Sequence, residues 1–182
     1  AAVICVEDPL REEAADAVRE LKEAGITKVV MMTGDSERTA AAIAKRVGVD
    51  EYYSEVLPED KAAFVEKEKE LGHKVIMIGD GINDSLALSS ASVGIAISDG
   101  AAIAREIADV TISADNLHEI VTLKRLSTAL MKRIHNNYRT IIGVNGGLIA
   151  LGVTGVIMPT TSALLHNMST LTISLRSMRN LL

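Results

Sequence analysis

The stretch Gly79-Asp80-Gly81-Ile82-Asn83-Asp84 places two carboxylates and one amide within a single short turn. It follows an apolar segment, and its two glycines allow the chain to turn sharply. Two acids this close repel each other unless a divalent cation neutralises them, and a site made only of oxygen ligands favours Mg²⁺. We therefore predict that Asp80 and Asp84 bind Mg²⁺. The alternative is a purely structural turn.

Thr33, Gly34 and Asp35 follow another apolar segment and precede a predicted helix. A threonine hydroxyl and free backbone N–H groups in front of a helix can form a cradle for a phosphate group. Asp35 can instead be only the N-cap of that helix. Both interpretations stay open for so short a sequence.

Lys61 lies near the start of a predicted helix that begins at Pro58. A cation is unfavourable there, because the N-terminal end of the helix dipole is positive. This placement favours a second task for Lys61, which is to neutralise the charge of a phosphoryl group. A solvated surface lysine is the plainer alternative.

The elements that would position these residues alternate between strands and helices. Short apolar runs predict strands at 3–6, 28–32, 74–78, 93–97 and 110–112. Amphipathic or capped segments predict helices at 11–23, 36–47, 58–71, 84–88 and 101–107. Such alternation is typical of an α/β fold, in which helices cover both faces of a parallel sheet and ligands bind beyond the carboxyl ends of the strands.

The charge distribution divides the chain into two parts. All 24 Asp and Glu residues lie at or before Glu119, whereas seven of the 19 Lys and Arg residues come after it. The segment 140–175 contains no Asp, Glu, Lys or Arg. The acidic first part argues against binding of nucleic acid. The second part must lie in a different environment.

After a long predicted helix at 117–137, two apolar passes predict a helical hairpin. Residues 141–158 would span roughly 27 Å as a helix, at about 1.5 Å per residue, which is close to the hydrocarbon thickness of about 30 Å. Pro159 breaks this run, and 162–175 forms a second, more polar pass. Basic residues flank the hairpin, so the positive-inside rule places both of its ends, and the α/β domain, in the cytoplasm. The alternative is a pair of buried helices in a soluble extension.

Polar side chains inside the two passes are candidate ligands of a transported cation. They are Asn145 in the first pass and His166, Asn167, Ser169 and Thr170 in the second. Polar groups at membrane depth are costly and usually functional, although hydrogen bonds between the helices are an alternative. Ligands of these kinds suit Zn²⁺, Cd²⁺, Mn²⁺ or Co²⁺ better than Cu⁺, which prefers sulfur.

Together, Thr33-Gly34-Asp35, Lys61 and the turn from Gly79 to Asp84 resemble the later signature motifs of the haloacid dehalogenase superfamily. With Asp8-Pro9-Leu10-Arg11 and the predicted hairpin, the whole chain is similar to the C-terminal segment of a heavy-metal-transporting P-type ATPase. The resemblance implies a Rossmann-like parallel sheet, ATP and Mg²⁺ as cofactors, and contact with membrane lipid.

The resemblance also implies roles for single residues. Asp80 would coordinate Mg²⁺, and Asn83 and Asp84 would orient the phosphorylated site and its metal. Lys61 would contact the phosphoryl group, and Thr33 and Gly34 would bind the oxygens of that group. Asp35 would act structurally or toward the nucleotide. The implied domains are a phosphorylation domain at 1–119 that lacks the nucleophile strand, a linking helix at 120–139 and two transmembrane helices at 140–182. The protein would be integral to the plasma membrane.

The sequence also departs from the family pattern. Such pumps are phosphorylated on the Asp of an Asp-Lys-Thr-Gly-Thr motif, and the 182 residues contain no such motif. The nucleotide-binding insertion, the actuator domain and the earlier membrane helices are missing as well. We therefore expect the chain alone neither to hydrolyse ATP nor to form an acyl-phosphate, and to require the N-terminal part of the pump. The alternatives are an inactive fragment and a soluble phosphatase of the superfamily, which would need an Asp-x-Asp nucleophile.

Overall fold

The computed structural model describes residues 10–79, 82–97, 102–112 and 116–181. The predicted strand at 3–6, the Asp8-to-Arg11 motif up to Pro9, and the candidate ligand Asp80 lie outside these ranges. The chain divides into two compact units, Ala1–Thr122 and Leu123–Leu182. Each is described by itself.

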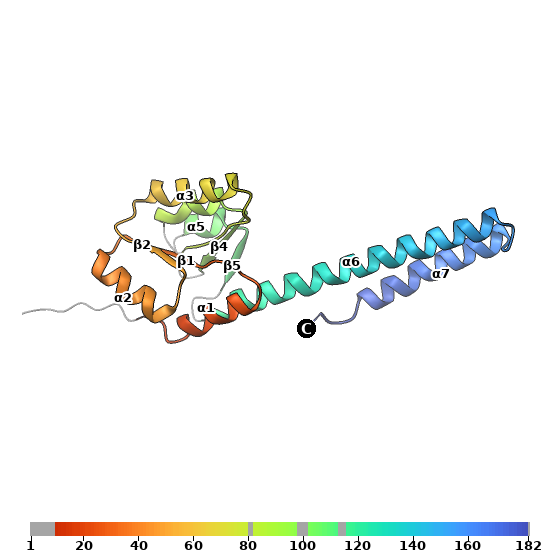
Figure 1. Ribbon diagram of the computed structural model, residues 1–182, viewed down its shortest axis with the longest axis horizontal. Coiled ribbons are helices and arrows are strands. Elements are labelled where there is room, and N and C mark those ends of the chain that lie inside the picture. The colour runs from red at the N-terminus through yellow and green to blue at the C-terminus, as the bar shows by residue number, and fades with distance from the viewer. Residues whose placement is uncertain (1–9, 80–81, 98–101, 113–115, 182) are drawn as a thin grey trace, which may run out of the picture. The chain divides into compact units, whose positions relative to one another are not determined.

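The first unit is built on parallel strands (Figure 1). β1 (Val30–Met32) pairs with β2 (Glu51–Tyr53), while β3 (Ile76–Gly79) pairs with β4 (Val93–Ile97), which in turn pairs with β5 (Val110–Ile112). Every pairing is parallel, which confirms the predicted α/β class. The single predicted sheet is corrected to two sheets within the described residues, one of two strands and one of three. The apolar-run criterion misses β2, because its Glu-Tyr-Tyr sequence is polar and exposed.

Helices flank these strands. α1 (Ala14–Glu23), α2 (Glu37–Val47), α3 (Pro58–Glu70), α4 (Ser85–Ser90) and α5 (Ala102–Ile107) agree with the predicted helices to within a few residues. The short 3₁₀ helix η1 (Ile82–Asp84) leads directly into α4. In Figure 1, α3 and α5 lie on one side of the strands, and α1 and α2 lie on the other.

The core of the first unit is small and aliphatic. Val65 of α3, Leu88 of α4 and Ile95 of β4 are at most 2% exposed. Ala62 and Ala87 pack with Val65, which lets α3 and α4 approach closely. Burial of such side chains contributes about 1.5–3 kcal/mol each. This layer therefore holds α3 and α4 against β3 and β4, and so fixes the two places from which Lys61 and Asp84 project.

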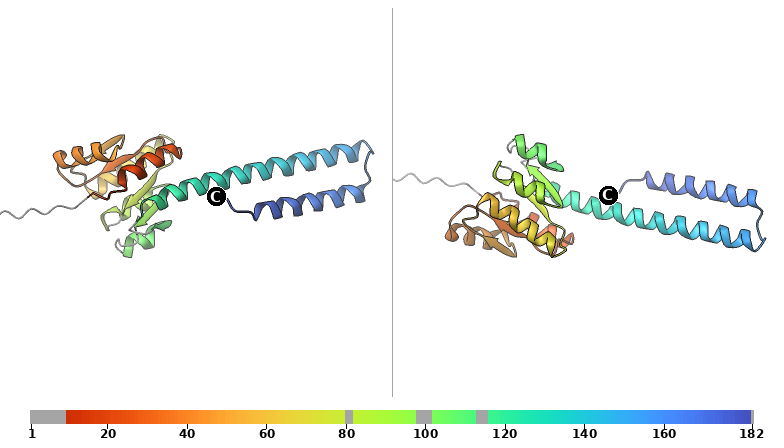
Figure 2. Two further views of the ribbon diagram at one scale, coloured as in Figure 1. Left: turned by 90° about the horizontal axis from the view of Figure 1, so that it is seen from below. Right: turned by 90° about the horizontal axis from the view of Figure 1, so that it is seen from above.

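The second unit is a helical hairpin. α6 (His118–Val153) is one continuous helix of 36 residues, whereas the sequence predicts separate helices at 117–137 and 141–158. α7 (Pro159–Ser177) begins at the proline that ends the first apolar pass. Both views in Figure 2 show the cyan and blue helices side by side and antiparallel.

The predicted end of the first pass at Met158 is wrong, because a glycine ends α6 earlier. Gly155 has a φ of 72°. The N–H of Val156 donates to the Leu151 carbonyl at 3.0 Å, and the N–H of Gly155 donates to the Gly152 carbonyl at 3.1 Å. These two bonds form a Schellman motif, in which glycine adopts the left-handed conformation without a Cβ clash. The apolar run is thus helical only as far as Val153.

Across the described ranges, no helix combines the length and the apolarity that a membrane crossing requires, so the predicted membrane-spanning pair is not confirmed.

The hairpin leaves many large aliphatic side chains exposed and half-buries a mixture of polar and aliphatic ones. Arg133 and Asn137 are half-buried on α6, as is Ser177 on α7, together with a few aliphatic residues. By contrast, Leu164 and Leu171 of α7 are each 60% exposed. A water-soluble helix pair would instead turn its apolar stripe toward the partner and leave a polar outer face.

Candidate functional site

Lys61 and Asp84 form an ion pair at the carboxyl end of β3. Lys61 lies in the first turns of α3 and Asp84 ends η1, so the packing of α3 against α4 brings the two together. Lys61 Nζ is 2.7 Å from Asp84 Oδ1, and the two side chains are 16% and 11% exposed. The pair explains why a lysine is tolerated near the positive end of a helix dipole, since Asp84 neutralises it.

Gly79 allows the Asp84 carboxylate to lie against the end of β3. A Cβ added at Gly79 would lie 2.6 Å from Asp84 Cβ and 2.8 Å from Asp84 Oδ2. Both distances are far below van der Waals contact, so a side chain at position 79 would displace the carboxylate. The glycine that the sequence assigns to a sharp turn is therefore required here for close approach.

Thr33 and Asp35 bind each other in the loop after β1. Thr33 Oγ1 donates to Asp35 Oδ2 at 2.8 Å, and the Asp35 N–H donates to Thr33 Oγ1 at 3.1 Å. The loop is anchored to β2, because the Thr33 N–H donates to the Tyr53 carbonyl at 3.0 Å. The N-cap of α2 is Ser36. The N-cap interpretation of Asp35 is therefore wrong, and its carboxylate instead fixes the Thr33 side chain.

The structure thus brings together some of the predicted site residues. Lys61 and Asp84 are in contact, and Thr33 and Asp35 are in contact. Asn83 is exposed next to Asp84. Gly34 leaves open space, since the nearest atom to an added Cβ is the Val56 carbonyl oxygen at 4.0 Å. Within the described part of the chain, no three His, Cys, Asp or Glu side chains gather into a metal-binding cluster.

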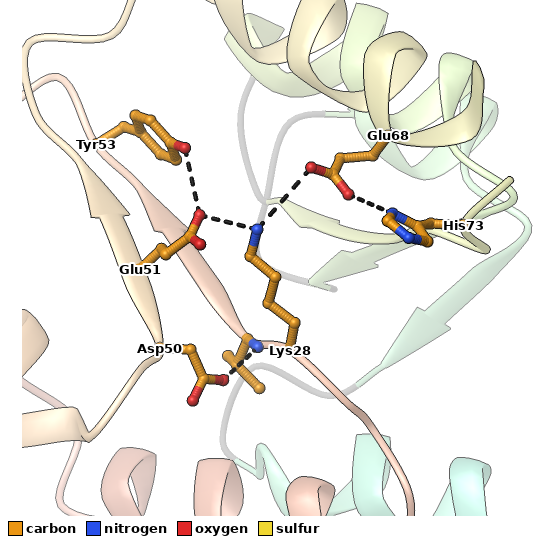
Figure 3. A network of polar contacts seen from close by, with 7 residues as sticks. Lys28, Asp50, Glu51, Tyr53, Glu68 and His73 are labelled. Atoms are coloured by element: carbon orange, nitrogen blue, oxygen red, sulfur yellow. Dashed lines mark hydrogen bonds and ion pairs between the residues drawn. The ribbon is translucent and has the colours of Figure 1, made fainter. Parts of the chain in front are cut away.

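A second polar network surrounds Lys28 (Figure 3). Lys28 Nζ is 2.8 Å from Glu51 Oε2 and 3.9 Å from Glu68 Oε1. Glu68 Oε2 in turn lies 2.6 Å from His73 Nδ1. The hydrogen bond between Lys28 and Glu51 raises the pKa of Lys28 and lowers the pKa of Glu51. The network joins β2 to α3 and to the turn that follows α3.

Two further carboxylates near β1 and β2 accept paired hydrogen bonds. Asp50 accepts from Lys22 Nζ at 2.6 Å and from the Val29 N–H at 2.7 Å, and the Lys22 bond is the main cause of its lowered pKa. Glu37 accepts from the Ser54 and Tyr52 hydroxyls at 2.5 and 2.8 Å, which lowers its pKa. Sequence reasoning misses these contacts, because they depend on the parallel register of β1 and β2.

The hairpin contains a cleft between α6 and α7. Its volume is about 690 Å³, and its polar lining residues are Asn145, Ser162, His166 and Asn167. His166 Nδ1 lies 2.8 Å from Asn145 Oδ1. Of the predicted ligands, the structure therefore brings Asn145, His166 and Asn167 to one cleft. The hydroxyls of Ser169 and Thr170 instead donate to the His166 carbonyl, at 2.8 and 3.1 Å.

The model of the haloacid dehalogenase-like hydrolase family matches residues 1–92. This range is half of the chain and contains Thr33, Lys61 and Asp84. The chain belongs to this family. The predicted membership of the superfamily is thereby confirmed.

Almost the whole chain is also homologous to heavy-metal P-type ATPases. It is 38% identical over 178 residues to a manganese-exporting P-type ATPase of Mycobacterium bovis, covering 97% of this chain and 25% of that protein. It is 43% identical over 165 residues to the copper-transporting ATPase 2 of Rhizobium meliloti, covering 91% and 20%. A crystal structure of a zinc-transporting PIB-type ATPase is similar with a TM-score of 0.85 and 34% identity, covering 97% and 28%. The chain therefore spans about a quarter of the length of these relatives.

Proposed function

We propose that the complete protein is an ATP-driven pump that exports a transition-metal cation, and that this chain supplies part of its phosphorylation site and part of its membrane pathway. One combination carries the proposal: a shielded Lys61–Asp84 pair and a hairpin with an aliphatic exterior occur in the same chain. Relatives named as exporters or transporters of manganese, copper and zinc, similar over nearly all of this chain, support it.

Lys61 would supply the positive charge that binds the phosphoryl group. Its ammonium group has three N–H donors, and the bond to Asp84 uses one of them. The other two can donate to phosphoryl oxygens. Because Asp84 already holds the ammonium in place, little reorganisation is needed when the phosphoryl group arrives. Gly34 would add a backbone N–H, and the Thr33 hydroxyl would turn its one proton from Asp35 Oδ2 to a phosphoryl oxygen.

The oxygen donors beside Lys61 fit Mg²⁺. Asp84 is 8% exposed and carries a second carboxylate oxygen beside Gly79, and the Asn83 amide lies next to it. Mg²⁺ in phosphate sites prefers such hard ligands from one or two carboxylates. Asp80 and Asp84 would hold the ion, which neutralises phosphoryl charge when it is bound. Lys61 would keep the Asp84 carboxylate oriented, and ATP would be bound by the complete protein.

His166 would be the main ligand of the transported cation. Asn145 Oδ1 is an acceptor, so the 2.8 Å contact requires the proton of a neutral His166 to be on Nδ1. The lone pair of Nε2 is then available to a metal, as in metal sites where a second residue orients a histidine. Asn167, Ser169 and Thr170 would complete the site with oxygen atoms. These ligands favour Zn²⁺, Cd²⁺, Mn²⁺ or Co²⁺ over Cu⁺.

The hairpin would lie in the plasma membrane. In this proposal residues 1–119 form the cytoplasmic phosphorylation domain, 120–139 the linking helix and 140–182 the two transmembrane helices. The exposed aliphatic side chains support it, because lipid tails rather than water stabilise such a surface. Since α6 ends at Val153, the hairpin would need a locally thinner bilayer or neighbouring helices.

Extraction of the chain from membranes distinguishes this proposal from the alternative that the protein is a soluble phosphatase. The full chain would be expressed in bacteria, and the membranes would be washed with high salt and alkaline carbonate. We expect the chain to stay in the pellet and to dissolve only in detergent. Release of a monomeric chain into the washes would overturn the membrane assignment.

Phosphorylation tests the first unit. The chain would be combined with a front part that carries Asp-Lys-Thr-Gly-Thr, and label from γ-labelled ATP would be measured. We expect Mg²⁺-dependent label on the combined protein and none on the chain alone. Lys61→Ala should lower the label about 100-fold, the scale of losing one charge-stabilising group. Lys67→Ala, an exposed lysine of the same helix, is the matched control. Equal labelling of the two variants would remove Lys61 from the site.

Transport tests the hairpin. The full-length pump would be assayed with Zn²⁺, Cd²⁺, Mn²⁺ and Co²⁺ separately, as wild type and as His166→Ala. We expect loss of transport of the cognate metal. His135→Ala is the control, because His135 contacts only its own helix at the Met131 carbonyl among the contacts of the described residues. Unchanged transport by the His166 variant would exclude it as a ligand.

A further inference from the structure

Arg133 of α6 donates hydrogen bonds to three carbonyl groups at and just beyond the C-terminal end of α7. Arg133 Nη1 donates to the Ser177 carbonyl at 3.0 Å and also to the Arg179 carbonyl, and Nη2 donates to the Asn180 carbonyl at 2.7 Å. The last carbonyls of a helix have no intrahelical donor. A planar guanidinium with five N–H groups can serve several of them at once. Arg133 thus closes the end of α7 with a side chain from the other helix.

A second contact lies one turn farther along α6. Asn137 Nδ2 donates to Ser177 Oγ at 2.6 Å, and Ser177 Oγ donates to the Ile173 carbonyl at 2.8 Å. Arg133 and Asn137 are four residues apart and share one face of the helix. Both bind α7 at or beyond Ser177. Together they set how far α7 extends along α6.

The Asn145–His166 contact belongs to the same antiparallel register. From Asn137 to Asn145, α6 advances by about 12 Å, and from Ser177 back to His166, α7 advances by about 16 Å, at about 1.5 Å per residue. Side chains of this length bridge the difference. α7 is unbroken between His166 and Ser177. A shift of α7 at Ser177 therefore moves His166 away from Asn145.

Little else in the hairpin holds this register. In the described hairpin, Gly143, Gly146 and Gly147 of α6 have no heavy atom within 4 Å of an added Cβ, beyond their own helix. Large aliphatic side chains such as Leu171 are exposed, and Leu148 and Val153 line the open cleft. Hydrogen bonds between the helices therefore contribute strongly to their relative position, above all in lipid, where the hydrophobic effect does not drive helix association.

We propose that Arg133 is a positioning residue: its guanidinium fork clamps the end of α7 to α6 and so sets the register that brings His166 to Asn145. The clamp rests on the geometry of the hairpin alone. Its consequence for metal binding rests on the proposed function, in which this pair serves the transported cation.

Spin labels test the register directly. The full chain, with Cys5→Ser, would carry labels at Ile134→Cys and Met178→Cys beside the clamp, or at Ile142→Cys and Leu171→Cys nearer to His166. All four positions are exposed, at 48%, 80%, 53% and 60%. The distances between the labels would be measured in detergent micelles for the protein with Arg133 unchanged and for the Arg133→Gln and Arg133→Lys variants. Lys132→Gln, which removes the neighbouring exposed charge, is the control.

We expect both Arg133 variants to change or broaden the distance at both label pairs, and the control to change neither. Lysine keeps the charge but lacks the fork, so a wild-type distance in Arg133→Lys would overturn the clamp in favour of a simple charge effect. A change beside the clamp alone would mean fraying of the α7 end and would overturn the positioning role. Unchanged distances in Arg133→Gln would overturn the proposal entirely. Circular dichroism checks that each variant stays helical.

Metal titration separates this inference from the proposed function. We expect Arg133→Gln to lower the affinity of the chain for Zn²⁺ or Mn²⁺ about tenfold, which is typical when the support of a ligand is lost. His166→Ala should abolish binding. If the wild-type chain binds neither metal while the label distances respond to Arg133, the metal site fails and the clamp stands. If the metal binds and Arg133→Gln changes neither affinity nor distances, the clamp fails alone.

Discussion

The two units of this chain treat polar and apolar side chains in opposite ways. In the described part of residues 1–122, the buried residues are aliphatic apart from Asp84. In the hairpin, large aliphatic side chains are exposed, while Arg133, Asn137 and Asn145 make the contacts between the helices. Burial of apolar surface holds the first unit together, whereas hydrogen bonds position the helices of the second.

The same contrast distinguishes the two candidate sites. The Lys61–Asp84 pair is charged and shielded, so each group depends on the other for neutralisation. The His166–Asn145 pair joins an imidazole to an amide and contains no carboxylate. In the proposed function, the first pair would serve a charged phosphoryl group, and the second a cation that has left water. Four predictions should separate the two units.

The largest effect is expected for Asp84→Ala. It leaves the shielded Lys61 ammonium without its partner, so the free energy of unfolding of the first unit should fall by about 3 kcal/mol or more. Urea denaturation followed by circular dichroism measures this. Asp35→Ala, at an exposed carboxylate, is the control and should cost much less. Equal losses in the two variants would mean that the Lys61–Asp84 pair contributes no more than a surface contact.

Glycine-to-alanine substitution should lower the free energy of unfolding in the first unit and raise it in the second. Gly79→Ala places a Cβ 2.6 Å from Asp84 Cβ, and overpacking of this kind costs about 1–3 kcal/mol. Gly143→Ala meets no heavy atom within 4 Å in the described hairpin beyond its own helix, and should stabilise α6 by about 0.5–1 kcal/mol. Denaturation of the two variants, the second in detergent, checks the signs. Stabilisation by Gly79→Ala would contradict the close approach of Asp84.

Acid should weaken the first unit and spare the hairpin. The pKa values of Glu37, Asp50 and Glu51 are lowered in the folded protein, chiefly by hydrogen bonds from Ser54, Lys22 and Lys28 respectively. Their stabilisation is therefore present above the unfolded pKa of about 4 and is lost as the pH falls through the folded values. The second unit, Leu123–Leu182, has no carboxylate side chain, since none follows Glu119.

Hydrogen exchange, measured peptide by peptide and corrected for the intrinsic pH dependence, compares the two units between pH 7 and pH 3. Asp50→Asn should reduce the acid sensitivity of the peptides around β1 and β2. The pKa of Lys28 is raised, mainly by its bond to Glu51, so its contribution is lost only as the pH rises through its folded value, above about 10.4. Equal acid sensitivity of the two units would contradict this assignment.

The smallest effect on stability is expected for Thr33→Ala. The lost hydrogen bond to Asp35 is exposed, so unfolding should change by less than about 1 kcal/mol. In the phosphorylation assay with the complete protein, the same variant should lose label while Thr33→Ser retains it. A variant that is equally stable and equally labelled would remove Thr33 from the phosphoryl site.

Much of the fold could be predicted from the sequence, because its signals are local. Apolar runs bounded by polar turns gave β4 and β5 at their observed bounds, and Pro58 marked the start of α3. The misses have local causes as well. β2 has no apolar run, and Gly155 lies in an apolar stretch where it could be taken for a packing residue rather than a helix end.

For the candidate sites, the sequence predicted which residues take part but not which of them are in contact. The sequence singled out Lys61, Asp84, Asn145 and His166 without indicating which of them meet. The contacts of Arg133 had no sequence signal, because a basic residue near a predicted hairpin has a sufficient explanation in the positive-inside rule. Partners 23, 21 and 44 residues apart, as in Lys61–Asp84, Asn145–His166 and Arg133–Ser177, depend on how whole helices pack.

The sequence by itself determined the α/β class, the lack of carboxylate side chains after Glu119 and the kinds of chemistry that the side chains can perform. These follow from side-chain chemistry and from periodicities that span only a few residues. The tertiary structure alone decided that Asp84 neutralises Lys61 against Gly79, that α6 runs without a break to Val153, and that Arg133 joins the two hairpin helices. Each of these depends on the relative position of separate elements, and packing rather than local preference sets that position.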